Sequence, residues 1–159
     1  MKNRTVDKDR GLKKLQKELR LLGQKPHVKA GLFGSANHKK SGQATVVDIG
    51  IVNEFGSPKR NIPERSFMRS TFDERKAFWF SRTRRVANLI LTGRMTVSRG
   101  LDILGLAIER DHKSKIRRGD PSWPELSEKT VQRKKGSPKK LIDSAQMVNS
   151  IKHKKVMNS

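Results

Sequence analysis

The sequence predicts an α+β fold in which a small antiparallel sheet packs against two main helices, with an N-terminal helix and a C-terminal helix or strand return. Two long segments, beginning near Thr71 and Thr96, repeat apolar residues at helical spacing. Residues 28–32 alternate apolar and polar side chains, as a half-buried strand does. At 159 residues the chain can build one modest core, so a single domain over residues 1–159 is expected.

Residues 1–24 are expected to form the N-terminal helix. One face carries leucines at helical spacing: Leu12, Leu15, Leu19 and Leu22. Asp9 is a candidate N-cap, and Gly23 followed by Pro26 marks the end of the helix. The other face is rich in lysine, so the predicted helix is amphipathic.

The strand at 28–32 is expected to lead into a mobile, basic hairpin loop at residues 34–44, which is polar and rich in small residues. Thr45 to Val47 would then return as the second strand. From Asp48 onward the pattern suits either a continued strand or a short helix capped by Asp48. Periodicity alone does not decide between these two structures.

Thr71 and Glu74 have the spacing of a capping box, which predicts that the first main helix begins at Thr71. Its expected buried stripe consists of Phe72, Trp79, Val86 and Ile90. The second main helix is expected from Thr96 or Ser98 to about Gly119.

The C-terminal part of the sequence is expected to form shorter secondary-structure elements. Residues 120–124 form a rigid turn, and Ser127 caps a short helix. Asp143 is a candidate N-cap for a helical turn that reaches Ile151. Residues 152–159 are expected to form a basic strand or tail.

Charge is the strongest property of the composition. There are 37 Lys and Arg residues against 15 Asp and Glu, which gives a net charge of +22 and a pI near 11.1. Such an excess favours a polyanion or an acidic protein surface as the partner. Cysteine is absent, which excludes disulfides and thiolate chemistry. We also expect no membrane segment and a cytosol-like compartment.

Residues with catalytic potential are few. The four histidines, which show no metal-ligand spacing, are expected at the surface: His27, His38, His112 and His153. Asp111 and His112 are adjacent, so on a helix they point to different faces. No phosphate-binding loop is present either. The sequence therefore predicts no enzyme activity, no cofactor and no metal.

Two segments resemble a known family. The first is Asn53-Glu54-Phe55-Gly56, followed by Ile62-Pro63-Glu64-Arg65-Ser66-Phe67-Met68-Arg69. The second begins at Leu126-Ser127 and ends with Leu141-Ile142-Asp143-Ser144-Ala145-Gln146-Met147 and Asn149-Ser150-Ile151. Together they resemble, in the same order, the tail-completion or head–tail joining proteins of tailed-phage necks, similar to the minor tail protein Z group.

The resemblance implies a structural virion protein that forms a ring of six copies at the head-proximal end of the tail. The ring would lie in the neck of the virion, between the tail terminator protein and the head-closure or connector protein, after assembly in the host cytoplasm. It also favours a short helix after Asp48. The chain departs from the usual family residues at three positions: Ser66 replaces proline, Ala145 replaces glycine and Met147 replaces leucine.

Glu54 and Arg65 flank the same apolar connector, so a buried ion pair between them is one hypothesis. The alternative is that both side chains face water.

Contact with the phage genome would involve only the DNA backbone, because no sequence-reading motif is present. The candidate DNA-facing residues are Lys39, Lys40, Arg82, Arg84 and Arg85. The alternative function is a free nucleic-acid-binding protein without sequence specificity. A small basic ribonuclease is a third possibility, although no acid–base set is evident.

Overall fold

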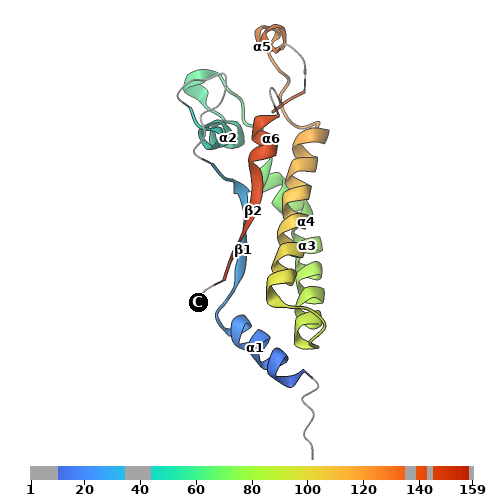
Figure 1. Cartoon of the computed structure of the whole chain (residues 1–159). Helices are drawn as coiled ribbons and strands as arrows, with labels where there is room; N and C mark the ends of the chain where they lie inside the picture. The colour runs from blue at the N-terminus through green and yellow to red at the C-terminus, as the bar shows by residue number, and fades with distance from the viewer. Residues whose placement is uncertain (1–10, 35–43, 135–138, 143–144, 158–159) are drawn as a thin grey trace, which may run out of the picture.

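Two long antiparallel helices and a two-stranded ribbon form the body of the molecule (Figure 1). The computed structural model describes residues 11–34, 44–134, 139–142 and 145–157. The long helices are α3, Met68–Leu91, and α4, Val97–Arg118. Beside α4 lies the antiparallel pair β1, His27–Leu32, and β2, Ile151–Val156. This is an α+β fold with a small sheet, which confirms the predicted fold class.

The partner of β1 differs from the prediction. β1 pairs with β2, from His27 opposite Val156 to Leu32 opposite Ile151, so the C-terminal residues form a strand. The predicted second strand at residues 45–47 is wrong, because these residues start a helix, α2, Val46–Phe55.

A local cap explains why α2 begins there. The Thr45 hydroxyl accepts a hydrogen bond from the Asp48 N–H at 3.1 Å, while the Asp48 carboxylate accepts one from the Thr45 N–H at 2.9 Å. This reciprocal capping box satisfies two N–H groups at the start of the helix. Thr45, and not Asp48, is therefore the N-cap.

The shorter helices lie at the two ends of the long pair (Figure 1). Helix α1, Leu12–Gly23, confirms the predicted N-terminal helix and packs where α3 turns into α4. At the other end lie α2, the short 3-10 helix η1, Pro58–Arg60, and α5, Glu128–Arg133, which follows Ser127 as predicted. Helix α6, Gln146–Ser150, leads directly into β2.

The start of α3 is also corrected. The helix begins at Met68, and Thr71 lies buried inside it with its hydroxyl donating to the Phe67 carbonyl at 2.6 Å. Phe72, expected in the core, is 50% exposed, because the described chain covers only part of this face of the helix. Its ring contacts that of Trp79 at a centroid distance of 6.0 Å.

The core has two parts. One part, around the turn between α3 and α4, contains Val86, Ile90, Val97 and Leu101. The other lies around Phe67 and takes residues from α2, α4, α6 and β2. Asp9, the loop prediction over residues 35–43 and the candidate cap Asp143 lie outside the described residues. None of the helices described by the structure is both long and apolar enough to span a membrane.

Candidate functional site

The two family-like segments, which lie far apart in the sequence, meet in one cluster that we call the signature junction. Its buried core is Val46, Phe67, Ile116, Trp123, Met147, Val148 and Ile151, with Leu141 and Ile142 packed against it. Phe67 is almost completely buried, at 1% exposed. Most of the apolar signature residues therefore serve a shared core and not an open catalytic pocket.

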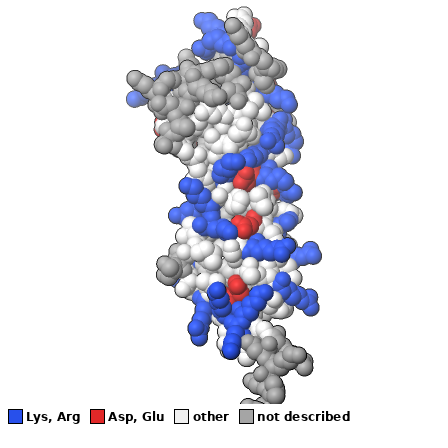
Figure 2. Space-filling model, viewed as in Figure 1, with Lys and Arg blue, Asp and Glu red and all other residues white. Residues whose placement is uncertain are grey.

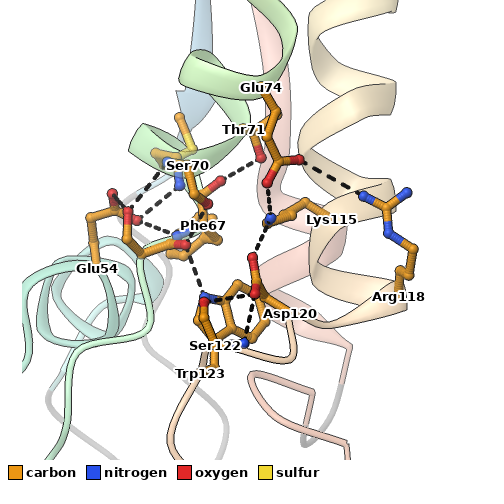
Figure 3. Close-up of polar contacts among 12 residues, drawn as sticks. Glu54, Phe67, Ser70, Thr71, Glu74, Lys115, Arg118, Asp120, Ser122 and Trp123 are labelled. Carbon is orange, nitrogen blue, oxygen red and sulfur yellow. Dashed lines mark hydrogen bonds and ion pairs between the residues drawn. The ribbon is translucent and has the colours of Figure 1, made fainter.

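Glu54 is the central polar residue of the junction (Figure 3). Its carboxylate accepts hydrogen bonds from the backbone N–H groups of Phe67 at 2.7 Å, Met68 at 2.8 Å and Arg69 at 2.9 Å. The Ser66 hydroxyl donates a further bond at 2.8 Å. A side chain at the end of α2 thus caps the start of α3, where unpaired N–H groups and the helix dipole favour a negative charge.

Burial raises the pKa of Glu54, but the hydrogen bonds from Met68, Arg69 and Ser66 outweigh it. The pKa therefore lies below its ordinary value of 4.5. Glu54 is 5% exposed and carries its charge inside the fold.

The hypothesis of a Glu54–Arg65 ion pair is wrong, and so is the alternative that both side chains face water. Glu54 pairs with Arg69, whose Nε lies 3.1 Å from the carboxylate. Arg65 is buried and donates from Nε to the Pro124 carbonyl at 3.1 Å and from Nη2 to the Glu125 carbonyl at 3.0 Å. Arg65 therefore fastens the first signature segment to the chain just before the second one.

The backbone near Gly56 explains why glycine is required in this signature. Gly56 has φ of 72°, and a Cβ there would lie 2.9 Å from the Glu64 nitrogen. Ile62 pairs with Ser57 in an isolated bridge just beyond this turn. The neighbouring Phe55 ring is exposed and lies 4.6 Å from the Arg69 guanidinium.

A buried lysine fixes the other side of the junction. Lys115 is 3% exposed and hydrogen-bonds to Glu74 of α3 and to Asp120, which follows α4 (Figure 3). Burial lowers the pKa of Lys115, but these two carboxylates outweigh it and raise the pKa above its ordinary value. Lys115 thus stays charged and ties both long helices to the turn at residues 120–124.

A cleft of about 570 Å³ lies between the two signature segments. Helix α2 and the first segment contribute Ile49, Asn53, Ile62, Pro63 and Arg65. The second segment contributes residues that include Leu126, Leu141 and Met147. Its described walls hold one carboxylate, Glu125, and no histidine. The lining of the cleft is mixed, with apolar side chains beside the cationic Arg65, Arg133 and Lys134.

His112 corrects the expectation of surface histidines. It is 4% exposed, stacks on Trp79 at a centroid distance of 5.6 Å, and its Nδ1 lies 2.8 Å from the Ile108 carbonyl. Burial lowers its pKa from the ordinary value, although backbone hydrogen bonds oppose the shift. The signal in the sequence is its spacing, since His112 follows Leu101, Leu104 and Ile108 on one face of α4.

Asp111, the neighbour of His112, is held by side chains of α3. The Asp111 carboxylate accepts hydrogen bonds from Trp79 Nε1 at 2.8 Å and from Arg75 Nε at 3.1 Å. His153 is also partly buried, with Nδ1 2.7 Å from Glu109. Both carboxylates therefore serve packing contacts between elements.

Three of the candidate DNA-facing residues, Arg82, Arg84 and Arg85, lie on α3. Arg82 is half-buried beside Phe78, while Arg84 and Arg85 are exposed on α3. Lys39 and Lys40 lie outside the described residues. Lys and Arg side chains occur along the whole visible face of the molecule, with few acidic side chains between them (Figure 2).

In the part of the chain that the structure describes, no group of three or more His, Cys, Asp or Glu side chains is placed to hold a metal ion. Comparisons with protein-family models, curated proteins and solved structures gave no match. The interpretation of the site therefore depends on its own geometry and on the two sequence signatures.

Proposed function

We propose that this protein is a structural subunit of a phage neck, whose copies form a ring that completes the head-proximal end of the tail and joins it to the head. The observation that supports this most directly is an apolar groove beside α3 in a chain of net charge +22. The groove, of about 600 Å³, is lined by Ala30, Met68, Arg69, Phe72, Asp73, Trp79, Ile108 and His112.

The groove suits contact between copies. A large aromatic side chain that is half exposed, such as Phe72, becomes favourable when a neighbour covers it. Each copy in a closed ring meets the next through two different patches, so a groove on one copy receives another surface of its neighbour. Further exposed apolar side chains are available for that second patch: Phe80, Leu91 and Leu106.

The signature junction supports the same assignment. Its conspicuous residues hold α2, α3, α4 and the C-terminal return in one fixed arrangement. A ring subunit needs such a rigid body because its two contact patches must keep a constant relative orientation. Six copies, a tail terminator on one side and a head-closure or connector protein on the other are the expected assembly.

The charge supports a contact with the genome that passes through the ring. Lysine and arginine side chains bind DNA phosphates by releasing counterions, without reading the base sequence. The protein would be assembled in the host cytoplasm and reside in the virion neck. A free nucleic-acid-binding protein has the same charge but requires no ring.

Size-exclusion chromatography with light scattering, followed by negative-stain imaging with and without phage tails, tests this proposal. We expect a ring of six copies, alone or on the end of the tail. Phe72→Ser should abolish the ring while leaving the circular dichroism of the monomer unchanged. Lys76→Ser, an exposed position on the same helix, is the matched control and should leave the ring intact. A monomer that ignores tails would overturn the proposal.

A further inference from the structure

The two strands have an inner face and an outer face. Directly opposite residues of an antiparallel pair share a face. The inner face carries Val28, Leu32 and Ile151, which belong to or pack against the two cores. The outer face carries three exposed lysines, Lys29, Lys152 and Lys154, together with Gly31 and the His27–Val156 pair at its end. We call these three lysines the lysine ladder.

The ladder concentrates like charges. Lys29 lies directly opposite Lys154. Lys152 lies two residues before Lys154 in β2 and therefore on the same face. Neighbours on one face of a strand are only about 7 Å apart, and like charges opposite each other destabilise the pair. The ribbon has two strands within the described chain, so it has little other pairing to offset this repulsion.

The inner-face lysine shows the contrast. Lys155 donates to Asp102 and to Ser98 of α4, each at 2.9 Å. None of the three ladder lysines forms an ion pair with a carboxylate of the described residues. The sequence also has no Asp or Glu from Leu19 to Val47 or from Ser144 to Ser159. The ribbon's own residues supply no carboxylate, and the attraction recorded for the ladder within the described residues is that of Glu109 of α4 for Lys152.

We propose that the outer face of the β1–β2 ribbon is a binding surface for the phosphate backbone of double-stranded DNA. A two-stranded ribbon has the width that the DNA major groove admits. Lysine ammonium groups act as mobile point charges, which suits phosphate contact without base recognition. The Phe33 ring lies under Lys154, 4.7 Å from its Nζ, and adds an apolar contact at the end of the ladder.

This inference rests on the DNA contact in the proposed function and assigns it to residues other than Arg82, Arg84 and Arg85. The test measures binding of the full chain to a labelled random-sequence DNA duplex by fluorescence anisotropy over a series of salt concentrations. The ladder variant is Lys29→Gln with Lys152→Gln and Lys154→Gln. The control, Lys59→Gln with Arg60→Gln and Lys129→Gln, removes the same charge from exposed positions near α2 and in α5.

We expect the ladder variant to flatten the slope of log affinity against log salt by about 0.9 for each lysine, and the control to change it little. Equal slopes for the ladder variant and the control would overturn the inference. Ladder-dependent binding to a glutamate-rich peptide, with DNA binding unaffected, would overturn it in favour of an acidic protein partner. Unchanged circular dichroism shows that both variants fold.

Light scattering on the same samples separates this inference from the proposed function. Rings whose salt-sensitive DNA affinity depends on the ladder support both. Rings that do not bind DNA overturn the inference and leave the neck assignment standing. A monomer that binds DNA through the ladder supports the inference and overturns the ring.

Discussion

The Glu54 carboxylate lies 2.7 Å from the backbone nitrogen of Phe67 and accepts its hydrogen bond. The residue that ends α2 thereby supplies the cap of α3, and the connector between the two helices is closed over the Phe67 core. The signature glutamate therefore caps the start of a long helix.

Glu54→Gln should lower the free energy of unfolding by about 1.5–3 kcal/mol, because an amide satisfies the converging N–H donors less well than a carboxylate does. Urea unfolding followed by circular dichroism measures the change. Glu64→Gln is the control, since exposed Glu64 pairs with the half-exposed Arg69 side chain at the surface, and it should change stability by less than about 0.5 kcal/mol. Equal effects would contradict the capping role.

Acidic pH should remove the contribution of Glu54 to the stability of the fold. Its folded pKa is lowered from 4.5, so the stabilisation is full above pH 4.5 and is lost as the pH falls through the folded value. The difference in stability between the wild type and Glu54→Gln should shrink over that range. A constant difference would show that ionisation of Glu54 is not what the capping bonds require.

Arg65→Lys should destabilise the fold by about 1–3 kcal/mol, because a lysine cannot reproduce the two bonds to the Pro124 and Glu125 carbonyls. Thermal unfolding checks this. Arg60→Lys, at an exposed position in η1, provides the comparison and should leave the melting temperature unchanged. An Arg65→Lys protein as stable as the wild type would show that these bonds contribute nothing.

His112 should make the free energy of unfolding depend on pH below about 6.5. Burial lowers its pKa from 6.5, so at mildly acidic pH the unfolded chain binds a proton that the folded chain does not. Stability is therefore full above pH 6.5 and decreases as the pH falls below that value.

Chemical unfolding of His112→Leu at several pH values tests this expectation. The variant should show a flatter profile than the wild type, whatever its absolute stability. His27→Gln, at an exposed position, should retain the wild-type slope. A slope that survives in His112→Leu would assign the effect to another group.

Ala145→Gly should stabilise the protein by about 1 kcal/mol, because Ala145 has φ of 56° and a side chain is strained in the left-handed region. Ala77→Gly, the same substitution in the exposed interior of α3, should instead cost about 1 kcal/mol. Melting temperatures that shift in the same direction would refute the role of the backbone angle.

The sequence pattern predicted the secondary-structure elements that are determined by neighbouring residues. Leucines at helical spacing located α1, and Thr96 located the start of α4, because each depends on residues within a turn or two. Glu54 could not be matched to α3 in this way, since nothing local indicates which helix end a distant carboxylate will cap. The apparent capping box at Thr71 was a local pattern that this long-range contact overrode.

Strand pairing escaped prediction for a similar reason. Alternation identified β1, but it carries no information about which segment pairs with it. Thr45 to Val47 alternates too weakly to compete with the capping box that joins Thr45 to Asp48. Arg65 likewise binds two carbonyls, and a backbone acceptor leaves no trace in residue identities.

The start of α4 is also capped by a side chain from another helix. Glu18 of α1 is buried, and its carboxylate accepts a hydrogen bond from the Val97 N–H at 2.7 Å. Val97 itself has no exposed surface. Trimming the chain to begin at Gln24 would remove the carboxylate to which this amide donates, at the point where α4 starts. The amino-terminal helix is thus coupled to the start of α4, which lies far downstream in the sequence, and shortening the chain would remove a helix cap as well as reduce its size.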